Sequence, residues 1–173
     1  ERAVDALLNS KRPLIWSGQG VLMGAASESL TELAELAGIP VMTTMPGKSG
    51  FNETHPLSLG ATNLTYSGQA RKWLDESDVV FAVGTSMTGT HYGQRPPDGK
   101  TLIHCSADPS DINRDYDIDM PLPGDAKLVL DAMIEIANGK VSEPGHRRRA
   151  ETEREIKASR DPWMESWQPI LTS

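Results

Sequence analysis

The sequence is short of cysteine, of net positive charge and of long apolar runs, and each shortage excludes a class of protein. Its single cysteine, Cys105, excludes an intrachain disulfide and a cysteine-rich metal site. The net charge of −7 argues against a nucleic-acid partner, whose phosphates require clustered lysine and arginine. No apolar run reaches membrane-spanning length and no signal-like segment opens the sequence, so we expect a cytoplasmic protein with no membrane partner.

Groups that could perform catalysis are also scarce. The four histidines lack the spacing of metal ligands, and no His–Asp pair can be assigned to Ser17 or Ser86, the serines expected at strand ends. Lys48 stands in a Pro-Gly-Lys-Ser run and not in the longer pattern of a phosphate-binding P-loop. The sequence therefore predicts neither a catalytic residue nor a metal site.

Two other groups have a structural and a functional interpretation. His104 and Cys105 fall in an expected strand, where a satisfied core or edge histidine and an inert buried thiol are the usual states. His91 lies in the polar loop 85–95, which either contacts a ligand or is an ordinary surface loop.

Short apolar segments alternate with helix-like stretches along residues 2–138. This alternation is typical of a parallel sheet covered by helices on both faces. The expected strands are residues 14–17, 41–44, 79–83, 101–105 and 118–122, with a short extra strand at 58–60 in an otherwise long loop. The expected helices are residues 2–9, about 25–37, a turn or more around 70–74, and a helix capped by Asp125 that ends at 138.

Ligands of such sheets bind at the carboxyl ends of the strands, where this sequence places the glycine-containing segments 18–20, 46–50 and 84–86. Gly18-Gln19-Gly20 is similar to the start of a dinucleotide-binding fingerprint, whose glycines let a phosphate approach backbone amides. The spacing is not Gly-x-Gly-x-x-Gly, and Thr43 and Thr44 stand where an acidic residue would end the second strand. A phosphate site and a merely tight strand-to-helix turn both remain open.

The segment 140–173 differs from the rest in being polar and densely charged. It lacks a continuous apolar face over 140–160, so we expect a solvated or loosely held linker there. Trp163 and Trp167 are four residues apart and can share one helix face. Two exposed tryptophans require something to bury them, and a domain outside this chain is one candidate.

Several motifs, in order, resemble the central domain of thiamine-diphosphate-dependent enzymes such as acetolactate synthase, pyruvate oxidase and benzoylformate decarboxylase. The resemblance covers roughly residues 2–138 and is more specific than any one motif. The segments that carry it are RPLI at 12–15, GQG at 18–20, LAELAGIPV at 33–41, GKSGF at 47–51, HPLSLG at 55–60, SDVVFAVG at 77–84, Ile103-His104 with Asp108-Pro109, and GDA at 124–126.

The resemblance implies an α/β fold: a three-layer, doubly wound, Rossmann-like parallel sheet of about six strands in the order 3-2-1-4-5-6. It implies a central domain at 1–139 and a charged linker at 140–173 that leads toward a C-terminal cofactor-binding domain absent from this chain. In the parent enzyme, which acts on a 2-oxo acid by decarboxylation or carboligation, the N-terminal domain supplies a glutamate that activates thiamine diphosphate. The C-terminal domain holds Mg²⁺ and the diphosphate. The parent is expected to be a homodimer or homotetramer, and this chain alone to be inactive.

Some family members bind FAD or ADP in the central domain, and the resemblance carries those contacts to positions in this sequence. FAD-binding members have an arginine and aspartates after the glycine of the fourth motif and an acidic residue at the position of Ser106. Here residues 85–90 carry no charge, so we expect a vestigial crevice that binds FAD poorly. The alternative is a free-standing FAD- or adenine-nucleotide-binding Rossmann-like module. The candidate cofactor-binding residues are Gly18, Gln19, Gly20, Thr44, Met45, Gly60, Gly84, Thr85 and Ser86.

Overall fold

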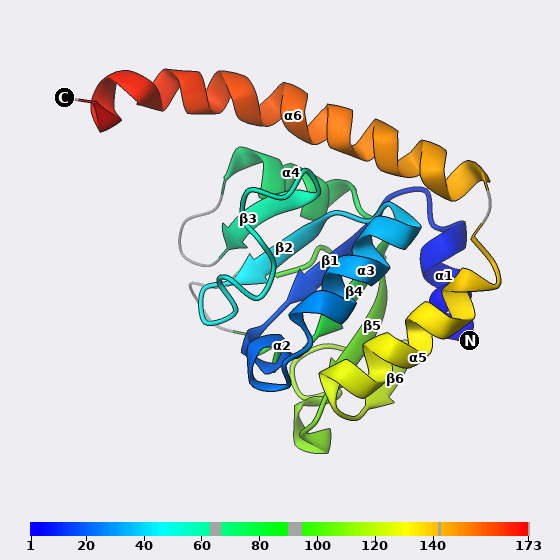
Figure 1. Cartoon of the computed structure of the whole chain (residues 1–173). Helices are drawn as coiled ribbons and strands as arrows, with labels where there is room; N and C mark the ends of the chain where they lie inside the picture. The colour runs from blue at the N-terminus through cyan, green and yellow to red at the C-terminus, as the bar shows by residue number, and fades with distance from the viewer. Residues whose placement is uncertain (63–66, 90–94, 142, 173) are drawn as a thin grey trace.

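A computed structural model describes residues 1–62, 67–89, 95–141 and 143–172 (Figure 1). Its centre is a six-stranded, all-parallel sheet in the order β3-β2-β1-β4-β5-β6, which confirms the predicted doubly wound topology. The strands are β1 Pro13–Ser17, β2 Val41–Thr44, β3 Ser58–Thr62, β4 Val79–Val83, β5 Thr101–Ser106 and β6 Met120–Pro123.

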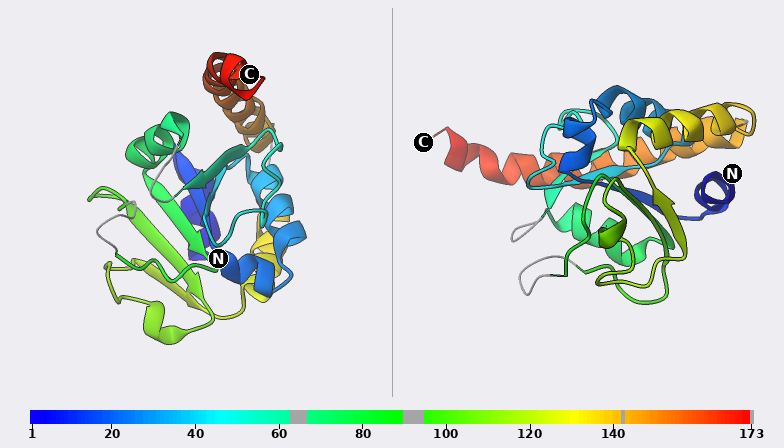
Figure 2. Two further views of the ribbon diagram at one scale, coloured as in Figure 1. Left: turned by 90° about the vertical axis from the view of Figure 1, so that its left-hand side faces the viewer. Right: turned by 90° about the horizontal axis from the view of Figure 1, so that it is seen from below.

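Helices cover both faces of the sheet (Figure 2). Apolar residues of α1, α3 and α5 form one buried cluster with alternate strand positions such as Ile15 and Phe81. The intervening strand positions, among them Leu14 and Val80, form a second cluster with α4 and one residue of α6. Side chains that alternate between two covered faces explain why β1 and β4 are buried at every position. The helices are α1 Arg2–Asn9, α2 Gln19–Met23, α3 Ser27–Ala37, α4 Gly68–Glu76, α5 Ala126–Asn138 and α6 Glu143–Leu171, with a 3-10 turn η1 at Pro109–Asp111.

Local signals set the ends of two helices, and the expected cap at Asp125 is confirmed. Asp125 caps α5 by accepting hydrogen bonds from the amides of Lys127 (2.9 Å) and Leu128 (3.1 Å). Gly38 ends α3 in the left-handed conformation, with φ of 65°.

The last strand begins two residues later than expected and ends one residue later. Residues 118–122 were expected, whereas β6 is Met120–Pro123. The cause lies at Asp119, whose side chain accepts a hydrogen bond from the amide of Leu102 (2.8 Å) while its own amide donates to the carbonyl of Leu102 (3.1 Å). Two prolines then fall inside β6, which is tolerated because β6 is an edge strand.

The largest difference concerns residues 140–160, which were expected to be solvated or loosely held. The structure has a helix, α6, that runs along the edge formed by the amino ends of the strands (Figures 1 and 2). Ile156 is fully buried in the cluster with α4, and Thr152 is 6% exposed. The hydroxyl of Thr152 donates to the carbonyl of Gly38 (3.2 Å). The first half of α6 is therefore packed against the domain.

Charged side chains of α6 attach it to the amino edge. The guanidinium of Arg148 donates to the carbonyls of Leu7, Leu8 and Ser10 at the end of α1, at 3.2, 2.8 and 2.8 Å. Glu155 accepts two hydrogen bonds from Arg12, at 3.1 and 2.7 Å, and Arg12 lies over the ring of Trp73. Pairs of this bidentate geometry are stronger than ordinary surface ion pairs. The charges that favoured a solvated linker are the groups that hold the helix in place.

Shortening the chain tests whether α6 is an integral part of the domain. Residues 1–160 retain Ile156 and Arg148 and should unfold with nearly the same free energy as 1–173. Residues 1–140 lose both and should be less stable by at least about 2 kcal/mol, the burial energy of one large aliphatic side chain. Urea denaturation followed by circular dichroism measures the difference, with Ile156→Ala in 1–160 as an intermediate case. Equal stability of all three would show that the packing of α6 adds nothing.

Candidate functional site

A cavity of about 400 Å³ opens at the carboxyl edge of β1, β2, β3 and β4. This is the edge at which doubly wound sheets bind ligands. One part of the lining is apolar and another carries hydroxyl groups. The apolar part is Trp16, Met23, Pro46 and Met87, and the hydroxyl groups belong to Thr44, Thr62, Thr85, Ser86, Thr88 and Tyr116.

The sequence-predicted site residues fall into two groups. Gln19, Gly20, Thr44, Gly84, Thr85 and Ser86 line the cavity. Gly18, Met45 and Gly60 do not: Gly18 packs behind the cavity against Gly84, Met45 is 48% exposed, and nothing lies near the Cα of Gly60 on the side where a Cβ would project. A role of these residues in binding a cofactor stays a prediction.

The residues that sequence reasoning missed carry no ligand-binding motif. Trp16 and Thr62 are ordinary strand residues by pattern, and Tyr116 lies 30 positions after the segment 84–86. Only the parallel arrangement of the strands brings them to one edge. His91 lies outside the described residues.

The glycines pack one loop against another at the point where strand order reverses between β1 and β4. The amide of Gly18 donates to the carbonyl of Val83 (2.9 Å), and that of Gly20 donates to the carbonyl of Gly84 (2.7 Å). A Cβ on Gly18 would lie 2.3 Å from the Gly84 oxygen. The amides of both glycines are thus used within the protein, which favours the tight-turn interpretation.

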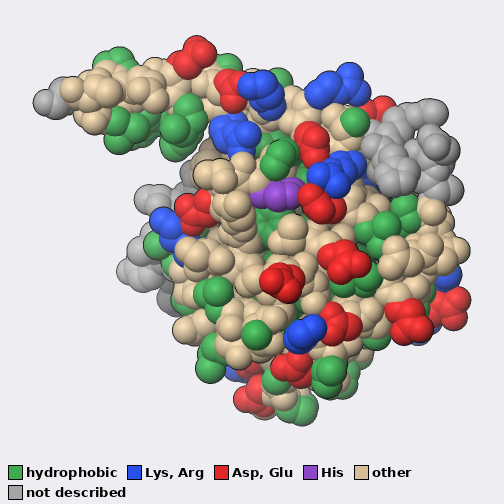
Figure 3. Space-filling view, in the orientation of Figure 1, with side chains coloured by type: hydrophobic (Ala, Val, Ile, Leu, Met, Phe, Trp, Pro, Cys, Tyr) green, Lys and Arg blue, Asp and Glu red, His purple; other side chains and the backbone are tan. Residues whose placement is uncertain are grey.

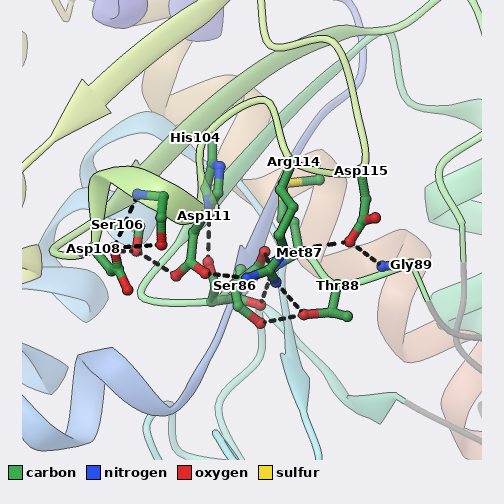
Figure 4. Close-up of polar contacts among 12 residues, drawn as sticks. Ser86, Met87, Thr88, Gly89, His104, Ser106, Asp108, Asp111, Arg114 and Asp115 are labelled. Carbon is green, nitrogen blue, oxygen red and sulfur yellow. Dashed lines mark hydrogen bonds and ion pairs between the residues drawn. The ribbon is translucent and has the colours of Figure 1, made fainter.

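Several charged groups beside the loop after β4 come from the segment between β5 and β6 (Figure 4). Arg114 reaches the loop after β4, where it donates to the carbonyl of Ser86 (3.3 Å) and to the hydroxyl of Thr88. The same guanidinium pairs with Asp111 at 2.8 Å, and Asp115 accepts from the amide of Gly89 at 2.9 Å. Residues 85–90 carry no charge in their own sequence. The fold brings charge to them from downstream and from Arg95, whose guanidinium lies 3.2 Å from the place of a Cβ on Gly89.

Arg114 itself offers little positive potential to an anionic ligand. The one guanidinium in the network of Figure 4 is paired with Asp111 and lies 3.5 Å from Asp115. Asp111 also accepts from the hydroxyl of Ser106 (2.9 Å), the position where FAD-binding relatives were expected to have an acid. Two carboxylates around one guanidinium repel rather than attract a diphosphate.

The two buried titratable groups of β5 are occupied with structural contacts. The Nε2 of His104 lies 2.8 Å from the carbonyl of Thr85, which can only accept, so Nε2 carries the proton. Burial, and then the charge of Asp125, raises the pKa of Cys105 to about 11. Since the thiol is fully buried and protonated at neutral pH, the prediction of an inert cysteine is confirmed.

Within the described residues, no cluster of three or more histidine, cysteine or acidic side chains could hold a metal ion. Over the same part of the chain, no helix has both the length and the apolar character needed to cross a membrane.

A doubly wound sheet of this strand order, with a cavity at its carboxyl edge, defines a Rossmann-like α/β domain. Residues 1–133 match the family "Thiamine pyrophosphate enzyme, central domain". The chain belongs to this family, which confirms the resemblance drawn from its sequence.

Proteins similar to this chain carry names that agree with this family. A "Probable acetolactate synthase large subunit" of Methanococcus aeolicus is 37% identical over 136 residues, which is 78% of this chain and 23% of the relative. An acetolactate synthase of Mycobacterium avium is 36% identical over 130 residues, or 73% and 21%. A crystal structure described as that of a thiamin diphosphate-dependent enzyme from Mycobacterium smegmatis superposes with a TM-score of 0.64 at 27% identity, over 78% of this chain and 27% of that one. The chain thus spans about a quarter or less of the length of these proteins.

Alanine substitutions of Gly84 and Gly60 distinguish the cost of a steric clash from the cost of a positive φ alone. Gly84 and Gly60 both have positive φ, 61° and 85°. A Cβ at Gly84 would lie 2.6 Å from the amide nitrogen of Val21, whereas a Cβ at Gly60 would meet nothing within 4 Å. Gly60→Ala should therefore lower the free energy of unfolding only by the conformational cost of about 1–2 kcal/mol.

Gly84→Ala should lower it further, because the clash is with backbone that cannot turn away. Chemical denaturation of both variants measures the difference. Equal losses would mean that the loops at the β1–β4 junction can separate without cost.

Proposed function

We propose that the full-length protein is an acetolactate-synthase-like enzyme that decarboxylates a 2-oxo acid or joins it to a second one. The observation that carries the proposal is the identity of 36–37% to acetolactate synthases across the whole central domain. The thiamine diphosphate of such an enzyme supplies a carbon nucleophile. In this proposal other domains of the parent hold it together with Mg²⁺. The parent is a homodimer or homotetramer in this proposal.

The central domain has a structural role in this enzyme, with residues 1–139 as its body. Its strands contain no charged residue that could act as a catalytic group. The amides of Gly18 and Gly20 at the β1–β4 junction already donate to backbone carbonyls. The family assignment favours this role over a free-standing nucleotide-binding module. The segment 140–173 connects the body to the domain that follows.

FAD does not fit the crevice well. The amides of Gly18 and Gly20, which a fingerprint would offer to its diphosphate, already donate to carbonyls, and the guanidinium of Arg114 is already paired. Arg95, beside Gly89, is the cation that remains near the rim. The cavity itself is large enough for a nucleoside-sized group beside Trp16. We therefore propose that FAD is not a cofactor of this protein. The crevice should bind adenine nucleotides weakly at most.

Assays of the full-length protein and of residues 1–173 test the enzymatic proposal. With pyruvate, thiamine diphosphate and Mg²⁺, the full-length protein should release CO₂, and the chain 1–173 should release none. A second 2-oxo acid added to the full-length protein should report carboligation through a mixed product. Omission of thiamine diphosphate is the control. Turnover by residues 1–173 would show that the active site has been placed in the wrong domain.

Isothermal titration of residues 1–173 with FAD, and in parallel with ADP, tests the crevice. Each missing charge-assisted hydrogen bond forfeits about 1.5–3 kcal/mol, so the loss of two weakens binding by a factor of at least about one hundred. We expect no saturable heat with FAD at micromolar concentrations and weak heat at most with ADP. A micromolar or tighter dissociation constant for FAD would contradict the proposal.

A further inference from the structure

The far end of α6 presents an apolar face that projects beyond the body of the domain. Trp163 and Trp167 are 47% and 42% exposed, and their rings lie 5.9 Å apart between centroids. Met164 and Leu171 are also exposed, at 39% and 67%. Figure 3 shows hydrophobic side chains gathered on the underside of this projecting end, on the side that faces the rest of the molecule. We name these four residues the projecting face.

The projecting face continues the stripe by which α6 is docked. Thr152 and Ile156 are buried against the domain, and Trp163 and Trp167 follow them at intervals of four, seven and four residues. Residues at these intervals lie on one side of an α-helix. The surface of α6 that packs on the amino edge of the sheet therefore runs on, without turning, past the edge of the domain. A partner on the projecting face would extend an interface that already exists.

The projecting end also has little helical stability of its own. Pro162 and Pro169 both lie inside α6. A proline in a helix interior removes a backbone hydrogen bond and costs about 3 kcal/mol relative to alanine. A helix end that carries two prolines and exposes two indoles depends on packing against something else.

We propose that the projecting face of α6 is the docking surface for the domain that follows the central domain in the full-length protein. The inference rests on the multidomain parent proposed above, but not on its substrate. The family is that of a central domain, and the relatives extend over several times the length matched here, so the full-length protein has room for a domain that follows this helix in the same polypeptide. Attachment to the same polypeptide raises the effective concentration of such a domain at the projecting face.

A second copy of this chain fits the projecting face less well. A stable interface between free proteins takes about 20–30 residues from each partner, and the projecting face has four large apolar residues. A tethered domain does not need that area, because its association is intramolecular. Its surface should be apolar where it meets the indole rings and should offer oxygen acceptors to their N–H groups.

Hydroxyl-radical footprinting of the full-length protein and of residues 1–173 measures the cover on these tryptophans. Trp16 and Trp73 are 8% and 4% exposed and serve as internal references that should react slowly in both proteins. Trp163 and Trp167 should be oxidised readily in residues 1–173. In the full-length protein they should be protected about tenfold, which corresponds to about 1.4 kcal/mol of docking free energy.

A photo-crosslinking side chain at the same place identifies the occupant. Trp163→benzoylphenylalanine in the full-length protein should crosslink to peptides of the following domain within the same polypeptide. The same probe at Leu128, which is 71% exposed on α5, is the matched control and should not reach that domain. In residues 1–173, Trp163→Ala with Trp167→Ala should leave the free energy of unfolding unchanged, which shows that the body still folds.

Three results would overturn the inference. One is equal oxidation of Trp163 and Trp167 in both proteins. Another is a crosslink from position 163 to the preceding domain or to another subunit. The third is protection in residues 1–173 that rises with concentration together with a dimer in sedimentation. Protection and a crosslink within the chain, in a protein that does not act on pyruvate, would leave the docking intact and refute only the proposed function.

Discussion

The direct backbone contact between the loops after β1 and β4 is the constraint on which the functional edge depends. In a doubly wound sheet the connections leave in opposite directions at this junction, and the gap between them is the usual ligand crevice. Here Gly18 and Gly20 close that gap by donating to the carbonyls of Val83 and Gly84. Glycine is required because a Cβ at either Gly18 or Gly84 would lie within 2.6 Å of backbone or side-chain atoms of the facing loop. The cavity that remains is displaced toward Trp16, Thr44 and Thr62.

That closure supports the proposal that this domain, although its fold is associated with nucleotides, has a structural role. A dinucleotide site needs free amides at the first helix and a net positive rim. The amides are occupied, and the guanidinium of Arg114 at the rim is paired with Asp111 and lies near Asp115. Hydrogen bonds from Arg114 to Ser86 and Thr88 hold the loop after β4 in place instead. The positive charge of Arg114 therefore stabilises the protein's own loop after β4.

Sequence patterns predicted the sheet because its strands depend on local features. β1 and β4 are short apolar runs, and Asp125 and Gly38 are helix signals that act within a few residues. Arg114 was missed because its role depends on a contact with Ser86, 28 positions away, which no spacing reveals. α6 was missed for a different reason. It docks through the polar residues Arg148, Thr152 and Glu155 as much as through Ile156. A search for apolar periodicity predicts that such polar residues are exposed to solvent.

The cavity and α6 lie at opposite edges of the sheet, so ligand contacts and the attachment of a further domain would involve different edges. The cavity lies at the carboxyl ends of the strands, whereas α6 crosses the amino ends, where Arg148 holds the end of α1 and Glu155 holds Arg12. α6 is continuous from Glu143 to Leu171, so its docked half sets the direction of its projecting half. A domain carried by that helix is therefore oriented by the amino edge. Changes in the loops around the cavity should leave that orientation unaltered, because β1, β4 and β5 pair in continuous parallel register between the two edges.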